Sequence, residues 1–396
     1  MKIAILTSGI LPVPAVQGGA VENLVDFYLD YNDRNKLHDI TVYSVWHPDI
    51  EKHPALKSEV NHYIYLKTNT LWAKAKKYLY HLMYKKNEYY HYSVEFYLNW
   101  CIKQIKRKQF EAIIIENRPA FALKLSQVIH APIATHMEND FLNSTTRSHH
   151  QIYNSTTGFI NTSDYISRQV NSIASTKQKC FTVYNGIDVE RFYHAIPYER
   201  EKLKFGEQDF IIVYSGRLIK EKGILELIRA IKTLDDIPNL KLLVIGANAY
   251  GTGQTKSPFI CKLEEESEFI KDKVVYTGYV SYDQIPSYLK MADIAVLPSM
   301  WEEPFGLTVI EAMAAGLPLI TTNSGGIPEI CEEVATLVDR EHIVNNLAIA
   351  IRDLYHHLEK RKAMAEASLE RSKLFDKDTF AKNFFAALKK VINKRL

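Results

Sequence analysis

The sequence of 396 residues has few features of secreted, membrane-spanning or metal-binding proteins. Its four cysteines lie far apart and form no CxxC pair, so neither a disulfide framework nor a zinc site is expected. No apolar run approaches the roughly 18–20 residues of a membrane span. The start, MKIAILTSGILP, lacks the length and the cleavage site of a signal peptide. These absences favour a location in the reducing cytoplasm.

What is present is the composition of a globular protein, with 46% hydrophobic and 24% charged residues. The net charge of +3 is unevenly divided, because residues 1–185 carry +6 and residues 186–396 carry −3. The first part also holds 10 of the 14 histidines and 15 of the 24 tyrosines. We therefore expect two parts with different partners.

Short apolar runs alternate with helical patterns along the whole chain. KIAIL (2–6) is followed by a helix to about residue 29, and FIIVYSG (210–216) is followed by a helix over 223–234. Such alternation predicts parallel sheets with helical crossovers, and two series in a chain of this length predict two Rossmann-like, doubly wound α/β domains. The expected parts are residues 1–185, residues 186–375 and an amphipathic C-terminal helix at 376–396 that packs back on the first domain.

Loops after the strands are the candidate binding sites, because open α/β sheets bind ligands outside the carboxyl ends of their strands. Gly18 and Gly19 stand just before a helix, where backbone N–H groups can approach a phosphate or a sugar. A plain flexible loop explains this pair equally well. No GxGxxG motif is present, which argues against a nicotinamide or flavin enzyme.

His136 ends the strand PIATH and is expected to face the crevice at the sheet edge. It could bind a sugar or a phosphate, or move a proton, and a structural histidine is the alternative. In the second domain, Arg217 and Lys222 flank a strand-to-helix turn, where two cations suit a diphosphate. The alternative makes Lys222 a solvated residue of the first helical turn.

The stretch WEEPFGLTVIEAMAAG (301–316) contains two carboxylates around a glycine turn. The helix is predicted to begin within 305–307 and to run to Ala315, with Gly316 as its C-cap. Glu303 then precedes the helix, and Glu311 lies about 1.5 turns inside it. A diphosphate at the helix N-terminus fits between them, with a ribose diol on Glu311. Complementing the helix dipole is the alternative role for Glu303.

These motifs resemble those of known enzymes. EPFGLTVIE, with EAMAAGLP after it, resembles the E-x7-E signature of nucleotide-sugar glycosyltransferases of the GT-B fold, and most of all the retaining family 4. GRLIKEKG, VYNGID, TGYVS, NSGGIPEI and QGGAVEN also resemble segments of that family. The likeness is strongest over 184–330, whereas 50–110 and 140–180 carry no such motif. It implies two domains facing a cleft, the first for the acceptor and the second for the nucleotide sugar.

The resemblance implies transfer of a sugar from a nucleoside diphosphate to an acceptor hydroxyl, with the anomeric configuration kept. Arg217 and Lys222 would bind the diphosphate, Glu303 the sugar and Glu311 the ribose, while the loop at Tyr279 would meet the base. The catalytic residues implied are His136, Arg217, Lys222 and Glu303. The donor-binding residues implied are Gly18, Gly19, Arg217, Lys222, Val280, Glu303, Phe305, Gly306, Leu307 and Glu311.

No metal or other cofactor is expected beside the nucleotide sugar. In the family, cations and a helix end stabilise the leaving diphosphate in place of a required metal. The sequence also has no Asp-x-Asp motif in a suitable loop.

A basic, aromatic segment lies within residues 69–100. Five lysines between residues 74 and 86 are interleaved with Trp72 and several tyrosines. The segment predicts contact with an anionic membrane through residues 72–92, or with a lipid diphosphate acceptor, at the inner face of the membrane. A solvated helical face is the alternative. No nucleic-acid partner is expected, because no binding motif accompanies these charges.

The expected function is the synthesis of a cell-surface polysaccharide or lipid-linked glycan, with a glycan or lipid-linked acceptor. A nucleotide-sugar epimerase on the same fold is one alternative, which nucleotide release without an acceptor would favour. A non-catalytic carbohydrate-binding partner of another transferase is the second, and the four intact residues Arg217, Lys222, Glu303 and Glu311 argue against it.

Overall fold

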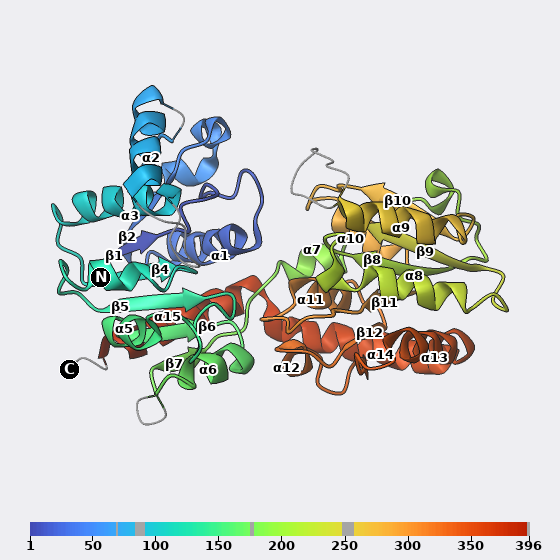
Figure 1. Cartoon of the computed structure of the whole chain (residues 1–396). Coiled ribbons are helices and arrows are strands. Elements are labelled where there is room, and N and C mark those ends of the chain that lie inside the picture. The colour runs from blue at the N-terminus through green and yellow to red at the C-terminus, as the bar shows by residue number, and fades with distance from the viewer. Residues whose placement is uncertain (69, 84–91, 175–177, 248–256, 394–396) are drawn as a thin grey trace. The chain divides into compact units, whose positions relative to one another are not determined.

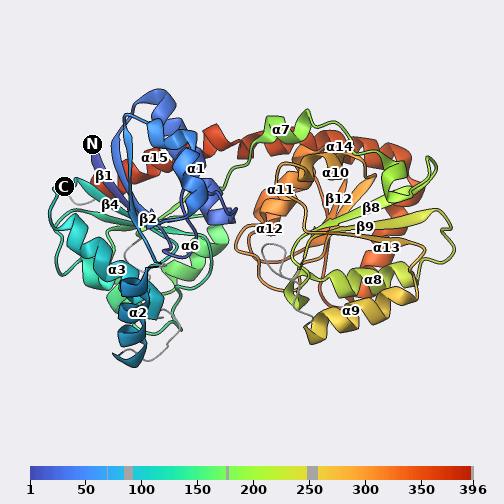
Figure 2. The ribbon, with the colours of Figure 1, turned by 90° about the horizontal axis from the view of Figure 1, so that it is seen from above.

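The structure is a computed structural model and describes residues 1–68, 70–83, 92–174, 178–247 and 257–393. It divides into two compact units, the first formed by Met1–Gly186 with Lys377–Leu396 and the second by Ile187–Asp376. Each unit contains a twisted parallel sheet with helices on its faces (Figures 1 and 2). The predicted α/β class with two doubly wound parallel sheets is therefore confirmed.

The first unit is built on a seven-stranded sheet with the order β3-β2-β1-β4-β5-β6-β7. The strands read as continuous apolar runs, as expected for parallel strands covered on both faces, and the side chains of Ile3 to Leu6 in β1 are completely buried. The strands are β1 (Lys2–Leu6), β2 (Asp39–Val45), β3 (Asn61–Leu66), β4 (Ala112–Glu116), β5 (Ile133–Met137), β6 (Gly158–Asn161) and β7 (Cys180–Thr182). The helices are α1 (Ala20–Asn35), α2 (Leu71–Met83), α3 (Tyr92–Ile105), α4 (Phe121–Leu125), α5 (His149–Ser155), α6 (Asp164–Asn171) and α15 (Lys377–Asn393).

The second unit is built on a six-stranded sheet with the order β10-β9-β8-β11-β12-β13. Its core lies between the sheet and α8, an amphipathic helix whose apolar side chains are buried, as the 3.6-residue pattern predicts. The strands are β8 (Phe210–Ser215), β9 (Leu240–Ile245), β10 (Val274–Gly278), β11 (Ile294–Leu297), β12 (Leu319–Thr322) and β13 (Thr336–Val338). The helices are α7 (Val189–Tyr193), α8 (Ile224–Lys232), α9 (Pro258–Glu268), α10 (Ile285–Lys290), α11 (Leu307–Ala314), α12 (Ile327–Cys331), α13 (Ile343–His356) and α14 (Leu358–Ser372).

The strand order reverses once in each sheet. In the first unit β1 lies between β2 and β4, and in the second unit β8 lies between β9 and β11. Chains leaving the carboxyl ends of two strands at such a switch point diverge to opposite faces and leave a crevice. The loops after β1 and β4, and after β8 and β11, are therefore the places where a ligand can meet each unit.

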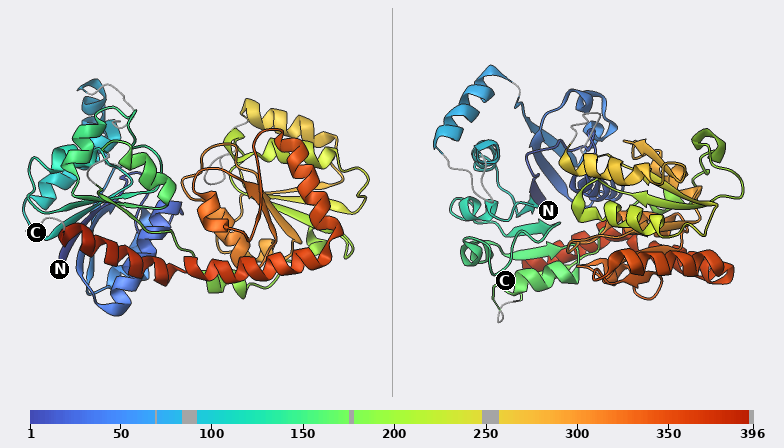
Figure 3. Two further views of the ribbon diagram at one scale, coloured as in Figure 1. Left: turned by 90° about the horizontal axis from the view of Figure 1, so that it is seen from below. Right: turned by 45° about the vertical axis from the view of Figure 1, so that its right-hand side comes forward.

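The C-terminal helix α15 packs on the first unit (Figure 3, left). The ring of Phe384 stacks on Tyr28 of α1, with ring centroids 4.4 Å apart and planes 2° from parallel. Gly158 in β6 makes room for the helix, because a Cβ there would lie 2.7 Å from a methyl carbon of Val391. The apolar face expected from the sequence, including Phe380 and Leu388, is buried in this contact.

Candidate functional site

The main candidate site lies at the switch point of the second unit. The loop after β8 carries Lys222 in a short 3-10 turn, and the loop after β11 carries Glu303. Gly223 ends the turn with φ of 69°, and a Cβ there would lie 1.8 Å from the carbonyl oxygen of Pro298. Only glycine allows the two loops to come this close.

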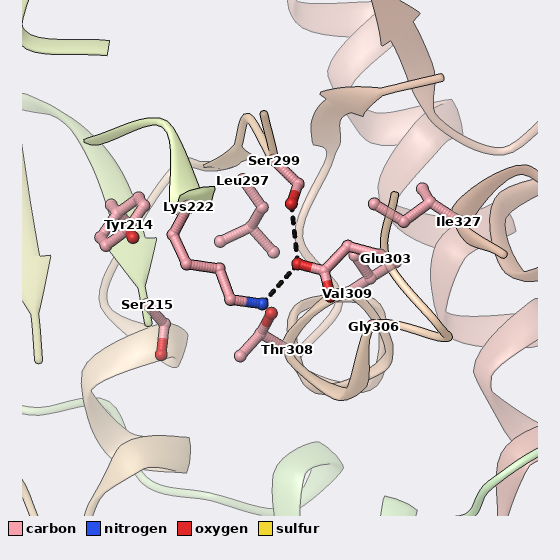
Figure 4. A pocket seen from close by; sticks show the side chains of 10 residues that line it. All are labelled: Tyr214, Ser215, Lys222, Leu297, Ser299, Glu303, Gly306, Thr308, Val309 and Ile327. Atoms are coloured by element: carbon pink, nitrogen blue, oxygen red, sulfur yellow. Dashed lines mark hydrogen bonds and ion pairs between the residues drawn. The ribbon is translucent and has the colours of Figure 1, made fainter. Parts of the chain in front are cut away.

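Lys222 and Glu303 form the charged centre of this site (Figure 4). The Lys222 ammonium pairs with Glu303 Oε1, which also accepts a hydrogen bond of 2.7 Å from Ser299 Oγ. The Glu303 side chain is buried, and the Lys222 ammonium lies 5.6 Å from the centre of the Trp301 ring. Lys222 therefore points into the site, so the alternative of a solvated first-turn residue does not describe it.

A small pocket opens beside this pair. Figure 4 shows side chains from the ends of β8 and β11 and from the start of α11 converging on it. Its lining includes Tyr214, Ser215, Lys222, Ser299, Glu303 and Thr308. The buried indole Nε1 of Trp301 has no hydrogen-bond partner among the described residues, which leaves a donor near Lys222 for a ligand.

The helix after Glu303 begins as the sequence predicts. Gly306 is the N-cap of α11, with φ of 119°, and no side chain caps the helix. The first-turn N–H groups, starting at Leu307, are thus left for a ligand or water. Phe305 is buried and its ring contacts Phe375 edge-on at 6.1 Å, which anchors the turn in its own unit. The helix ends at Ala314, one residue earlier than predicted, and Gly316 follows in the left-handed region.

Glu311 is buried inside α11, as the small residues around it imply. Burial raises the pKa of Glu311 to about 7, although a hydrogen bond from the Tyr282 hydroxyl opposes the shift. The raised pKa and the single neutral partner indicate that the negative charge of an ionised Glu311 is poorly stabilised in the free protein. It is therefore suited to accept hydrogen bonds from a polar ligand such as a diol.

Arg217 and Val280 lie at other parts of the same sheet edge. The Arg217 carbonyl accepts a 3.0 Å hydrogen bond from Tyr214, while the Arg217 side chain is exposed and does not line the pocket around Lys222. Val280 follows β10 and is half-buried next to the exposed Tyr279. The structure thus brings Lys222, Glu303 and the α11 N-terminus together, whereas Arg217 and Val280 lie at the rim of the site.

Glu302 is a residue for which no role was expected from the sequence. Its carboxylate accepts a 2.6 Å hydrogen bond from the backbone N–H of Gly325 and pairs with Arg340. The carbonyl of the next residue, Glu303, accepts a 2.8 Å bond from Gly326. These bonds fix the loop that carries Glu303 onto the loop after β12, so Glu302 positions Glu303 through the backbone. The NSGG motif in that loop is the sequence feature that could have pointed to this contact.

In the first unit, Gly18 and Gly19 precede α1 as predicted, both with positive φ. A Cβ on Gly19 would lie 2.3 Å from Glu22 Oε2, whereas a Cβ on Gly18 would meet no atom within 4 Å. Glu22 is buried, which raises its pKa, and it accepts a 3.1 Å hydrogen bond from Ser8. Glu22 therefore occupies part of the helix start, and binding of donor phosphate by the two glycines stays a prediction.

The expectation that His136 faces the crevice is wrong. Its side chain is completely buried, with Nδ1 2.8 Å from Glu116 Oε2 and Nε2 2.8 Å from Glu138 Oε1. Burial alone favours the neutral ring, but these two carboxylates raise the pKa of His136 to about 10. The rings of Phe380 and Phe384 cover it. His136 is a buried cation that compensates two carboxylates, which matches the alternative of a structural histidine.

Arg118 is a second residue that sequence reasoning missed. It follows β4, and its buried Nε has no hydrogen-bond partner among the described residues. Burial lowers the pKa of Arg118 and the Glu22 carboxylate opposes this, yet a guanidinium stays charged in proteins. A cation held in this way beside the loop after β1 suits an anionic group of a ligand. An arginine directly after the strand EAIIIEN was the available signal.

Comparison with known proteins agrees with this architecture. Residues 196–371 match the family model described as glycosyl transferases group 1. Spore coat protein SA of Bacillus subtilis is 27% identical over 387 residues, which cover 93% of each chain. The lipopolysaccharide 1,2-N-acetylglucosaminetransferase of Salmonella typhimurium is 30% identical over 171 residues, which cover 41% of this chain and 45% of the relative.

Among solved structures, HepE of Anabaena, whose crystal structure holds UDP and glucose, aligns with a TM-score of 0.74. The two are 17% identical, and the alignment covers 98% of this chain and 99% of HepE. The family match and these relatives support a glycosyltransferase, and the likeness to HepE shows the GT-B fold. The predicted class is confirmed, while membership of family 4 and retention stay predictions.

Proposed function

We propose that the protein transfers a sugar from a nucleoside diphosphate to an acceptor hydroxyl, with retention of the anomeric configuration. The observation that carries the proposal is the Lys222–Glu303 pair beside the uncapped start of α11 at the switch point of the second unit. A cation and free N–H groups there suit a diphosphate, and a carboxylate beside them suits sugar hydroxyls. HepE, with UDP and glucose in its crystal structure, supports a nucleotide-sugar donor.

In this proposal the residues divide the donor between them. Lys222 and the first-turn N–H groups at Leu307 bind the diphosphate, and Arg217 adds charge from the rim. Glu303 accepts hydrogen bonds from the sugar, and Glu311 accepts those of the ribose. Gly306 lets the backbone approach closely because it has no side chain. Val280 and its loop contact the base.

The reaction follows from where negative charge develops. The bond between the sugar C1 and the diphosphate oxygen breaks, and its electron pair leaves with the diphosphate. Lys222, Arg217 and the α11 N-terminus stabilise this charge, which is the role that a metal ion serves in other transferases. The acceptor oxygen forms the new bond on the same face of C1, and its proton passes to the leaving diphosphate. We propose that no metal ion is required.

The acceptor in this proposal is a glycan or a lipid-linked sugar, in the synthesis of a cell-surface polysaccharide. The relative from Salmonella, a lipopolysaccharide N-acetylglucosaminetransferase, supports a surface glycan as the product class. In the first unit, Arg118 offers the charge that an anionic acceptor group would meet. The enzyme would act in the cytoplasm at the inner face of the membrane.

A screen of nucleotides tests the proposal first. The melting temperature is measured with UDP, GDP, dTDP and ADP, and sugars of the nucleotide that stabilises most are then offered with EDTA present. NMR of the freshly released or transferred sugar reports its anomeric configuration. Stabilisation by one nucleotide and a retained anomer support the proposal. An inverted anomer contradicts retention, and an absence of stabilisation by all four contradicts the donor site.

A further inference from the structure

The helix α2 of the first unit carries an apolar stripe on its solvent side. Leu71 and Trp72 are 84% and 80% exposed, and Tyr78 and Leu79 are 64% and 56% exposed. The second pair follows the first by seven residues, or about two helical turns, so all four side chains share one face. Large apolar residues seldom gather in this way on a surface that faces only water.

The stripe is turned away from the unit that carries it. Ala73 is buried on the opposite side of α2, which packs against α3. Figures 1 and 2 both show α2 standing out from the sheet of its own unit. The usual explanation for an apolar helix face, burial in the core of the same unit, therefore does not apply to these four residues.

Two lysines border the stripe. With 3.6 residues per turn, Lys74 lies about 40° beyond Tyr78 on one side, and Lys76 lies about 40° beyond Trp72 on the other. Both lysines are exposed. An apolar face that is rimmed on both sides by cations, with Trp and Tyr among its members, is the arrangement of a helix lying in a membrane interface.

We propose that α2 docks the protein on an anionic lipid bilayer. Leu71 and Leu79 would enter the acyl boundary, Trp72 and Tyr78 the headgroup level, and the two lysines would meet anionic headgroups. A second copy of this chain fits less well, because it would bring lysines against lysines. Among the described residues no helix is long and apolar enough to cross a membrane, so docking at the surface is the mode proposed.

The surface is defined by residues 71–79, within the segment 72–92 that the sequence singled out. Residues 84–91 of that segment lie outside the described residues. The purpose of docking rests on the proposed function, since it would bring the enzyme to lipid-linked acceptors. Vesicle binding is measured without any donor or acceptor, so failure of docking and failure of sugar transfer can be told apart.

Cosedimentation of the full chain with vesicles tests the proposal. Vesicles of phosphatidylcholine with phosphatidylglycerol are compared with vesicles of phosphatidylcholine alone. We expect binding to the anionic vesicles that weakens with added salt. The double variant Trp72→Ser, Leu79→Ser should bind at least about tenfold more weakly, because two interfacial side chains are lost. Lys74→Glu with Lys76→Glu should reduce binding to anionic vesicles by at least about fivefold.

Matched controls come from the second unit. Phe269 and Ile349 are 74% and 59% exposed, and their double change to serine should leave vesicle binding unchanged. Melting temperatures confirm that each variant is folded. Equal binding to both kinds of vesicle, or undiminished binding by the Trp72, Leu79 variant, would overturn the proposal. So would a dimer of the wild-type chain that this variant abolishes, since the stripe would then cover a second copy.

Discussion

At the scale of single residues, the site depends on charges that are compensated only in part. Glu303 is buried against Lys222 and Ser299, whereas Glu311 has, within the part of the chain that the structure describes, only the Tyr282 hydroxyl as a partner. The Glu303 carboxylate is balanced by a cation, and in the proposed function this pair exchanges partners when a donor binds. Glu311 has no cation beside it among the described residues, so a ligand that donates hydrogen bonds would stabilise its charge the most. The two carboxylates therefore respond differently to mutation and to pH.

Replacing Lys222 by alanine should reduce turnover far more than stability. The variant loses the ammonium that would stabilise the leaving diphosphate, and loss of one such donor costs about 10²–10³ in kcat. Glu303 keeps its bond from Ser299, and water can reach the vacated site because Lys222 is 22% exposed. Initial rates with the donor found in the screen measure the effect. The control is Lys220→Ala, an exposed lysine of the same turn, and equal losses in both variants would contradict the assignment.

The pKa of Glu311 leads to a prediction on pH. Its pKa is raised from 4.5 to about 7 in the folded protein, so the buried group contributes stability below pH 4.5 that is lost as the pH rises through 7. Nucleotide binding should show the opposite trend, because only the ionised carboxylate accepts from both ribose hydroxyls. We expect tighter binding at pH 8 than at pH 6 by calorimetry. Glu311→Gln should bind more weakly and show a flat profile, and a pH trend that survives in this variant would contradict the ribose role.

Sequence reasoning succeeded in placing residues whose position depends on their own loop. The strand pattern placed Lys222 and Glu303 in loops at the carboxyl ends of two strands, and the structure shows that these strands, β8 and β11, are neighbours. His136 shows the limit, because its partner Glu116 lies on β4 and the rings that cover it lie on α15, while only Glu138 is near it in the sequence. Whether the His136 side chain becomes covered depends on where the C-terminal helix packs, and no local pattern contains that information.

At the scale of elements, α11 and the loops around it act as one assembly. The sequence predicted its start correctly because Pro and Gly fix the turn before it. The fixation of Glu303 by the loop after β12 was not predicted, since it consists of one bond to the Glu302 carboxylate and one backbone bond, both between segments about 23 residues apart in the chain. Gly325 permits that contact and provides a test.

Gly325→Ala should displace the loop that carries Glu303. Gly325 has φ of 56°, and a Cβ there would lie 2.0 Å from the carbonyl oxygen of Glu303. We expect a loss of stability of about 1–3 kcal/mol together with a marked loss of turnover. Gly316→Ala is the control, because Gly316 has φ of 76° but open space around its Cβ position. If both variants lost turnover equally, backbone strain rather than the displaced loop would be the cause.

At the scale of the whole molecule, the chain forms two units, and its end belongs to the first of them. The alternation of strands and helices was enough to predict both sheets, because parallel strands buried on both faces leave a strong apolar pattern. The apolar face of α15 was also predicted. Its partner surface on α1 and β6 could not be predicted from the sequence. That surface depends on a stacked aromatic pair and on a glycine that lies far from the helix in the sequence.

Phe384→Ala should destabilise the first unit more than the second. The ring is completely buried between Tyr28 and His136, and truncation of such a ring costs about 3–5 kcal/mol. Calorimetric unfolding should show an early transition for the first unit, while a nucleotide should still stabilise the second. Lys389→Ala, an exposed change on the same helix, is the control. A variant as stable as the wild type would contradict the packing described for α15.

The central claim is that the crevice between the ends of β8 and β11 binds the diphosphate of a nucleotide sugar. The most direct measurement is a crystal structure with the nucleoside diphosphate selected by the screen. The account predicts diphosphate oxygens about 3 Å from Lys222 Nζ and from the first N–H groups of α11, with the ribose hydroxyls on Glu311. A nucleotide bound elsewhere, or one whose ribose lies away from Glu311, would contradict it.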